Sequence, residues 1–270
     1  MGARPPGDDR LLDDLESGRR RAALPDPTCP DGWRVDAALK EQLLDLFRDR
    51  RHDAWQVAGL FGFRDRAALP PRRLVEPDGS GGPAAIAGWR IVPGGTSVRR
   101  GAYLGPRVTI MPPSYVNVGA WVGTDSMIDS HVLVGSCAQI GDRVHLAAGA
   151  QIGGVLEPPG ARPVIVEDDA FVGAGSVLLE GVLVHGGAVI AAGVTLTGTS
   201  RVHDLVDERV LEGSPEAPLA VPANAVVVPG ARAVSGSFGE RYGLAVATAL
   251  LVKYRDPGTD ARVALEGALR

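Results

Sequence analysis

The fold is decided by residues 98–152, which read VRRGAYLGPRVTIMPPSYVNVGAWVGTDSMIDSHVLVGSCAQIGDRVHLAAGAQI. Every sixth position of this stretch is a branched aliphatic residue, and the spacing resumes after a break at Val166. The seventeen positions are Val98, Leu104, Ile110, Val116, Val122, Ile128, Val134, Ile140, Leu146, Ile152, Val166, Val172, Leu178, Val184, Ile190, Leu196 and Val202. Four places after most of them stands a small or β-branched residue, such as Ala102 or Ala120.

A period of six fits neither an α-helix nor a simple alternating strand. It fits a triangular coil with one short strand on each of three sides, whose aliphatic residues fill the centre. Each coil hides its faces only by stacking on its neighbours. Glycine often follows the aliphatic residue, and we expect a positive φ at that position. Seventeen aliphatic residues in one register argue against the alternative, an ordinary β-sandwich.

The composition agrees with a fold of many tight corners, since the chain has 36 glycines and only 5% aromatic residues. A net charge of −4 gives no reason to expect nucleic acid or an anionic membrane as partner. No apolar run is long enough to span a bilayer, and residues 1–18 lack the apolar core of a signal peptide. Cys29 and Cys137 are too few for a disulfide framework. We therefore expect a cytoplasmic protein with reduced thiols.

The repeat has one interruption. Ile152 and Val166 are 14 positions apart instead of six, so residues 153–163 should leave the coil as a loop. Pro158 and Pro159 stiffen it, and loops on a rigid scaffold often carry function. The alternative is a tolerated surface insertion, but the stiffening favours a functional loop.

The flanks of the repeat predict two further domains. Residues 1–85 should form a small helical domain, because 11–15 and 35–48 have helical spacing, with Asp31 as the cap of the second helix. Segment 76–84 is expected to be a linker. Residues 86–205 should form the β-helix. Residues 206–270 should form a C-terminal extension, with one or two strands in YGLAVATALLVKYRD and a short helix at Ala261–Leu269.

Several blocks resemble the tetrahydrodipicolinate N-succinyltransferases, hexapeptide-repeat acyltransferases of lysine and diaminopimelate synthesis. These blocks are SYVNVGAWV at 114–122, VGSCAQIG at 134–141 and IGGVLEP at 152–158. The N-terminal GWRVDAALKEQLLDLFR and the C-terminal LLVKYRD are similar to that family as well. The left hand of the coil is taken from this resemblance, because right-handed crossovers are the general rule.

The resemblance implies an enzyme that transfers succinyl from succinyl-CoA to the amino group of L-2-amino-6-oxopimelate, the opened form of tetrahydrodipicolinate. It implies a homotrimer with active sites between neighbouring subunits, and a pantetheine arm along the coil under the protruding loop. No metal is implied.

Two residues match the family's substrate contacts. Asp129 matches an aspartate that contacts the substrate amine, where an acceptor could orient the amine and take its proton. Taken alone, Asp129 could equally be a turn aspartate. Arg90 matches the family's carboxylate-binding arginine, and its planar fork suits a dicarboxylate. Without the resemblance it would be one surface arginine among many.

Further candidates follow from their place in the matching blocks. Asn117 and Ser136 could line the substrate groove, and Glu157 could either anchor the loop or face the site. For CoA we expect mainly backbone contacts. The candidates for CoA are Gly154, Ala174, Gly175, Ala192 and Lys253. Lys253 or a nearby arginine would meet the phosphates, although a solvated lysine is the simpler interpretation.

The sequence departs from the family on the later coils. Where many members have GARSEVVEGV, this chain has GAGSVLLEGV, so Gly175 replaces an arginine and Val177 replaces a glutamate. That glutamate is a candidate acid–base partner of the aspartate, a part Val177 cannot play. Cys137 has no evident partner histidine in the sequence and is interpreted as a structural cysteine. The acyl donor, succinyl or acetyl, and the amine stay open.

Three alternatives remain. One is a related N-acyltransferase, using succinyl or acetyl, that acts on another amino acid. The second is a trimeric β-helix carbonic anhydrase, which needs three histidines around a metal. His131, His145 and His185 fall at different places in the hexad and argue against it. The third is a non-catalytic β-helix scaffold, which would not need the loop and groove motifs.

Overall fold

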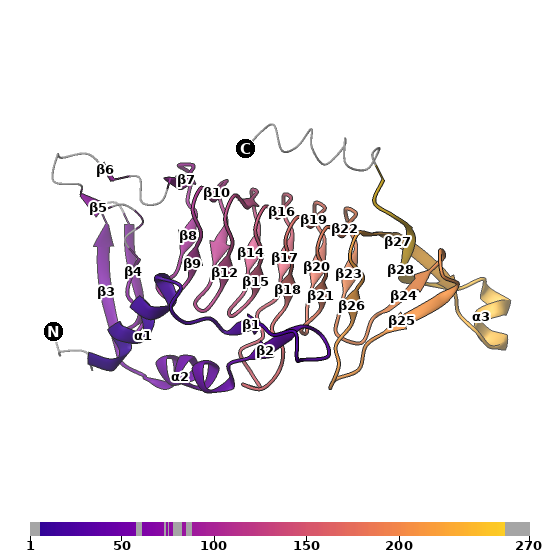
Figure 1. Cartoon of the computed structure of the whole chain (residues 1–270), viewed down its shortest axis with the longest axis horizontal. Helices are drawn as coiled ribbons and strands as arrows, with labels where there is room; N and C mark the ends of the chain where they lie inside the picture. Colours follow the sequence, from indigo (N-terminus) through magenta and orange to yellow (C-terminus); the bar gives the residue numbers. More distant parts are fainter. Residues whose placement is uncertain are drawn as a thin grey trace.

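The computed structural model describes residues 6–57, 61–72, 74, 76, 77, 83, 84 and 88–256. Its centre is a left-handed β-helix, in which short strands on three sides of successive coils stack in parallel (Figure 1). The hexapeptide spacing therefore predicted the architecture correctly.

We name the three sheets of the coil I, II and III in chain order. Sheet I contains β7 (Arg90–Ile91), β10 (Thr109–Ile110), β13 (Met127–Ile128), β16 (His145–Leu146), β19 (Phe171–Val172), β22 (Val189–Ile190) and β27 (Ala225–Ala233). Sheet II contains β8 (Ser97–Val98), β11 (Tyr115–Val116), β14 (Leu133–Val134), β17 (Gln151–Ile152), β20 (Val177–Leu178) and β23 (Thr195–Leu196). Sheet III contains β9 (Tyr103–Leu104), β12 (Trp121–Val122), β15 (Gln139–Ile140), β18 (Ile165–Val166), β21 (Leu183–Val184) and β26 (Ala220–Val221). The turns between them are the I/II, II/III and III/I corners.

The aliphatic residues of the repeat form the core of the prism. All seventeen are at most 5% exposed and belong to one hydrophobic cluster. Ile140 lies beside Val122 on one coil and beside Val166 on the next, although the loop separates Ile140 from Val166 in sequence. The loop therefore leaves the register of the coil intact.

The glycine prediction was wrong in its position. The glycine that directly follows an aliphatic residue has no positive φ; it is needed because the next coil passes close by. A Cβ on Gly105, for example, would lie 2.7 Å from the backbone nitrogen of Thr124. Positive φ occurs instead three places after the aliphatic residue. These residues include Gly101, Arg107, Gly119, Asp125, His131, Cys137, Arg143, Gly149, Asp169, Gly175, Gly181, Gly187 and Gly193.

The coil extends past residue 205, where the repeat predicted its end. Val221, not Val202, pairs beside Val184 in sheet III. A second excursion, residues 197–219, leaves the coil after β23 and carries an antiparallel hairpin of β24 (Arg201–Asp204) and β25 (Arg209–Glu212). Val202 is still fully buried, because it joins the end of the core cluster. The hexad spacing thus predicted correctly that Val202 is buried in the core, but it did not predict that Val221 would pair beside Val184.

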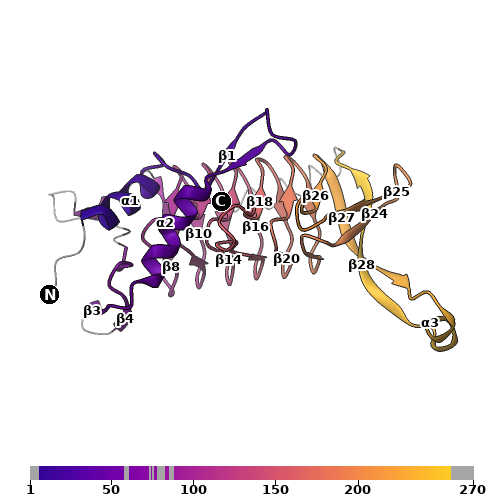
Figure 2. The ribbon, with the colours of Figure 1, turned by 90° about the horizontal axis from the view of Figure 1, so that it is seen from below.

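The C-terminal part forms a long hairpin. β28 (Ala245–Tyr254) pairs antiparallel with β27, and α3 (Ser237–Tyr242) lies at the tip, away from the coils (Figure 2). The strand prediction for this segment is confirmed as one strand. The helix predicted at Ala261–Leu269 lies outside the described residues.

The N-terminal part contains the expected helices and also strands. The helices are α1 (Pro6–Glu16) and α2 (Ala37–Arg48), and the strands form the hairpins β1 (Ala23–Pro25) with β2 (Trp33–Val35), β3 (His52–Val57) with β4 (Phe61–Arg66), and β5 (Glu76–Pro77) with β6 (Pro83–Ala84). Helical periodicity did not predict these hairpins. Asp36, not Asp31, caps α2, because its carboxylate accepts the Leu39 N–H at 2.8 Å and Asp31 lies before β2.

This N-terminal part packs on sheet III. The Arg21 guanidinium lies 4.2 Å from the centre of the Trp121 ring, and its Nε donates to Gln139 at 2.6 Å. Ala23 packs on Ile165 and Leu183. Burial lowers the pKa of Arg21 to about 10. The outer face of sheet III is therefore covered by the chain's own N-terminal segment.

Candidate active site

Asp129 begins the I/II corner directly after β13, at the surface of the prism and not in its core. It is half-buried, and its Oδ1 accepts the N–H of Ser130 at 2.7 Å. The turn is held from the preceding coil, because Ser114 Oγ donates to the Asp129 carbonyl at 2.7 Å. The carboxylate is therefore presented by a rigid corner.

The I/II corner carries only alanine and glycine on the coils that follow. Its residues there are Ala147, Ala148, Gly149, Gly173, Ala174, Gly175, Ala191, Ala192 and Gly193. Ala174, Gly175 and Ala192 are exposed, and a Cβ built on Gly175 would meet no atom within 4 Å. The structure thus brings these three CoA candidates together along one exposed edge of the prism lined by small side chains, which we call the I/II groove.

A cavity of about 470 Å³ lies at the far end of this groove. Its lining includes Gly193, Ser200, Arg201, Arg232 and Thr248. Arg201 donates to Glu212 at 2.8 Å. Neither arginine carries a signal in the sequence, because the second excursion and the C-terminal hairpin bring them to the groove from distant segments.

Lys253, the cation predicted for CoA phosphates, does not line this cavity. It lies in β28 opposite Val226, and its Nζ is 2.7 Å from an Asp256 carboxylate oxygen. Hexad spacing gave no information on where this strand would lie.

Arg90 is the first residue of sheet I and is exposed. It pairs beside Thr109, which pairs beside Met127, two residues before Asp129. Arg90 therefore lies two strands from the coil of Asp129, a separation of roughly 10 Å. The structure places these two predicted substrate contacts at the same end of sheet I.

The remaining candidates lie at another edge of the prism, the II/III corner. Asn117 is half-buried, and its Oδ1 accepts the Val118 N–H at 2.8 Å. Ser136, on the next coil, is buried, and its carbonyl accepts the Val155 N–H at 3.2 Å. A Cβ on Gly154 would lie 2.6 Å from the Ser136 nitrogen. Within one chain, sheet II therefore separates Asn117, Ser136 and Gly154 from Asp129 and the I/II groove.

The protruding loop begins at this II/III corner and is fixed to the N-terminal domain. The Lys40 side chain, fully buried in α2, donates to the carbonyls of Ala161 at 2.6 Å and Pro158 at 3.3 Å. Burial lowers the pKa of Lys40. The loop is thus held in place as well as stiffened.

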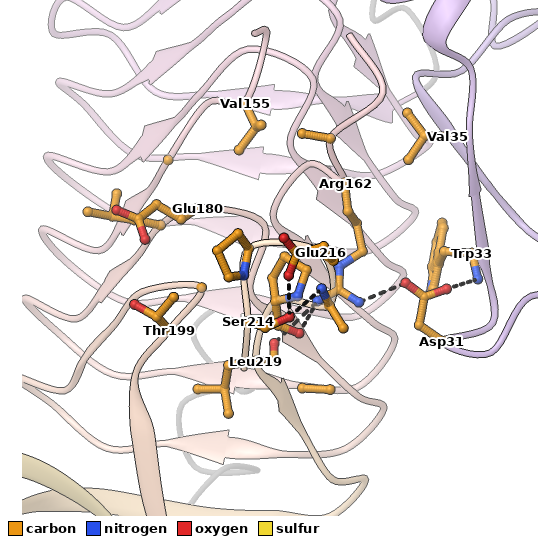
Figure 3. A pocket seen from close by; sticks show the side chains of 18 of the residues that line it. Asp31, Trp33, Val35, Val155, Arg162, Glu180, Thr199, Ser214, Glu216 and Leu219 are labelled. Carbon is orange, nitrogen blue, oxygen red and sulfur yellow. Dashed lines mark hydrogen bonds and ion pairs between the residues drawn. The ribbon is translucent and has the colours of Figure 1, made fainter. Parts of the chain in front are cut away.

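Arg162 fixes the other end of the loop. It is 9% exposed and donates to the Asp31 carboxylate at 2.7 Å, to the Gly181 carbonyl at 2.8 Å and to the Pro218 carbonyl at 2.7 Å. Figure 3 shows its side chain pointing toward Asp31. This one side chain joins the loop, the N-terminal domain, the coil and the second excursion.

The loop, the N-terminal domain and the second excursion line an open cavity of about 1440 Å³ (Figure 3). Gly154 and Glu157 line it, together with Asp31, Glu180 and Glu216. Glu157 therefore lines this cavity. The carboxylates outnumber the basic side chains of the lining.

Cys137 is fully buried beneath the N-terminal helices, in a cluster with Leu43 of α2. Burial raises the pKa of its thiol to about 12, against the opposing effect of Lys40. A thiol in this state is a poor nucleophile. The geometry agrees with a structural cysteine.

The three histidines of the metal-enzyme alternative lie on different parts of the coil. His131 is at the I/II corner, His145 is in β16 of sheet I, and His185 is at the III/I corner, where its Nδ1 is 3.1 Å from Glu167. Among the described residues, no three His, Cys, Asp or Glu side chains are grouped as metal ligands. The described part of the chain also holds no helix with the length and apolarity needed to cross a bilayer.

The fold and its repeat define a hexapeptide-repeat β-helix protein. The family described as "Hexapeptide repeat of succinyl-transferase" matches residues 163–198. A 2,3,4,5-tetrahydropyridine-2,6-dicarboxylate N-succinyltransferase of Nitrobacter winogradskyi is 45% identical, over 97% of this chain and 88% of its own. The enzyme of that name from Idiomarina loihiensis is 38% identical, over 96% of this chain and 87% of its own.

This chain belongs to the family of the 2,3,4,5-tetrahydropyridine-2,6-dicarboxylate N-succinyltransferases. Among solved structures, a putative 2,3,4,5-tetrahydropyridine-2-carboxylate N-succinyltransferase of Campylobacter jejuni is 17% identical, with a TM-score of 0.44, over 95% of this chain and 63% of that one.

Proposed function

We propose that this protein transfers the succinyl group of succinyl-CoA to the amino group of L-2-amino-6-oxopimelate, within lysine and diaminopimelate synthesis. The names of its relatives support the reaction. The observation that carries the proposal is the I/II groove, a path of exposed alanine and glycine that ends at Asp129. We also propose that the reaction takes place in the cytoplasm, where the two free thiols would stay reduced.

The acyl donor would lie in the I/II groove. Small residues let a pantetheine chain approach the backbone of Ala174, Gly175 and Ala192, and the cavity at the groove's end offers Arg201 and Arg232 to the phosphates. We assign this role to these arginines and not to Lys253, because Lys253 does not line the cavity. The thioester would then lie at the other end, beside Asp129.

The chemistry is aminolysis of a thioester, which needs a positioned amine and an acceptor for its proton. Asp129 would orient the amine, and Arg90 would bind a substrate carboxylate through its planar fork. Asn117 and Ser136 would contact the substrate from a neighbouring subunit, with Gly154 beneath the acyl donor.

We propose a homotrimer as the working assembly. None of the first residues of the sheet II strands is buried, and Tyr115, Leu133, Gln151 and Val177 are half-buried. In sheet III, three of the six first residues are buried, namely Gln139, Ile165 and Leu183. Packing sheet II against a neighbour would cover its half-buried side chains and bring a II/III corner of one subunit toward a I/II corner of the next. Both groups of candidate residues would then share one site.

A second candidate function is the same chemistry on another amino acid or with acetyl-CoA. Gly175 and Val177 favour it, because both stand at positions where the resemblance implies charged residues. The half-buried Val177 lies in sheet II between Gln151 and Thr195 and offers no proton acceptor.

The test is a panel of amines offered with succinyl-CoA and acetyl-CoA, read as free thiol and as the mass of the acylated product. We expect the highest kcat/KM with succinyl-CoA and an amino dicarboxylate. Faster transfer of acetyl, or to a monocarboxylic amino acid, would favour the second candidate. No thiol release and no CoA binding would contradict both and leave a scaffold.

A further inference from the structure

We propose that His131 is the proton acceptor for the substrate amine, working beside Asp129 in the site left without a glutamate at Val177. The inference rests on the proposed acyl transfer and adds a catalytic residue to it. It assigns orientation of the amine to Asp129 and removal of its proton to His131.

The placement of titratable groups along the I/II corner carries the proposal. From β7 to β22, the first three residues after each sheet I strand are Val92, Pro93, Gly94, Met111, Pro112, Pro113, Asp129, Ser130, His131, Ala147, Ala148, Gly149, Gly173, Ala174, Gly175, Ala191, Ala192 and Gly193. Among these described positions, only Asp129 and His131 carry a side chain that titrates. Both lie where the groove of small residues begins.

His131 stands in line with the groove. It takes the left-handed backbone position, φ 62°, that Gly149, Gly175 and Gly193 take on the following coils. Three coil steps of about 4.8 Å separate it from Gly193, so roughly 14 Å of groove leads from the arginine-lined cavity to the imidazole. That length is of the order of an extended pantetheine chain, whose thioester would end beside His131.

The backbone of His131 is fixed while its side chain is exposed. Its N–H donates to the Pro113 carbonyl at 2.6 Å, and its carbonyl accepts the Gln151 side-chain amide at 3.3 Å. Neighbouring coils thus hold the residue from both sides, and the imidazole is left open to a ligand in the groove.

The chemistry favours an imidazole over a carboxylate for this step. A general base works best when its pKa lies near the working pH, and imidazole is the side chain that ordinarily titrates there. Asp129 already accepts the Ser130 N–H, which suits it to a fixed, orienting contact. As the amine nitrogen attacks the thioester carbon, a C–N bond forms, a ring nitrogen of His131 takes the amine proton, and the C–S bond breaks. The departing thiolate then takes that proton and leaves as free CoA thiol.

The test compares wild-type enzyme with His131→Gly and His131→Asn, using succinyl-CoA and 2-aminopimelate. Glycine and asparagine both tolerate the left-handed backbone, so neither change strains the turn. We expect kcat to fall about 100-fold, with little change in either KM. Added imidazole should restore part of the His131→Gly rate, which a purely structural role would not permit. The matched control, His52→Gln in the exposed strand β3, should match wild type.

Two outcomes would overturn the inference, and they can be told apart. If wild type turns over and both His131 variants keep kcat within threefold, or lose it with no response to imidazole, His131 is not the base and the acyl transfer stands. If wild type itself shows no turnover with any amine or acyl-CoA, the proposed function fails and the role of His131 fails with it.

Discussion

At the scale of the residue, Asp129 tests the proposed chemistry. Asp129→Asn keeps the size of the side chain and its contact with the Ser130 N–H but removes the charge that would orient the amine. We expect kcat to fall by about 100-fold or more, while the assembly stays intact. Steady-state rates together with light scattering would measure both. Near-normal turnover would remove Asp129 from the mechanism.

Cys137 gives a second prediction at this scale, on reactivity. Its buried thiol, with a pKa raised to about 12, should stay unmodified by a thiol reagent at pH 8, whereas the half-buried Cys29 should react. We therefore expect one reactive thiol in the native protein and two after unfolding. Rapid labelling of both in the native state would contradict the burial of Cys137.

Glu167 links stability to pH. Burial opposes its ionisation, but hydrogen bonds from His185, Trp33 and the Gly186 N–H outweigh burial and hold the pKa of its carboxyl below the usual value. Because this pKa is lowered on folding, the contacts of the ionised carboxylate stabilise the fold at pH values above the pKa of the unfolded chain, about 4.3. This stabilisation is lost as the pH falls through the lower pKa of the folded protein. Glu167→Gln should therefore cost about 1 kcal/mol at pH 7 and progressively less below pH 4. Unfolding by urea across this range would measure it, and an equal cost at every pH would contradict it.

At the scale of the element, the loop at 153–163 is held by Lys40 on one side and Arg162 on the other. Arg162→Met would leave Asp31 and three carbonyls without this donor, so we expect a loss of about 3 kcal/mol in unfolding free energy and a raised KM for the acyl donor. The unfolding free energy of Arg162→Lys should lie between that of the wild type and that of Arg162→Met. The control is Arg107→Met, which breaks an exposed pair with Asp125 and should cost under about 1 kcal/mol. Equal costs for Arg162→Met and Arg107→Met would contradict the anchoring role.

At the scale of the whole molecule, the sequence predicted the part of the fold that repeats. Seventeen aliphatic positions specified the prism, because each must be buried by its neighbours on the adjacent coils. The same logic could not place Val221 beside Val184, since nothing in a hexad says how long an excursion runs before the coil resumes. It also placed positive φ at the wrong position, because close approach of backbones selects glycine as strongly as φ does.

The candidate site was predictable in its members but not in their grouping. Family blocks singled out Asp129, Asn117 and Ser136, yet only the folded coil shows that they occupy different corners. Arg201, Arg232 and Arg162 carried no local signal, because distant segments give them their partners and their place. Side chains whose roles depend on tertiary contacts between excursions lie beyond what a repeat can specify.

The central claim is that the two corners meet between subunits. It is tested most directly by mixing two variants, Asp129→Asn and a double change of Asn117→Ala with Ser136→Ala, each expected to be nearly inactive alone. In mixed trimers a share of the sites would combine an intact I/II corner from one subunit with an intact II/III corner from the next. With equal mixing we expect roughly a quarter of the wild-type rate to return, because each site draws one corner from each of two neighbours. Mixed assemblies that form but stay as inactive as their parents would contradict a site shared between subunits, as would a double variant that keeps full activity.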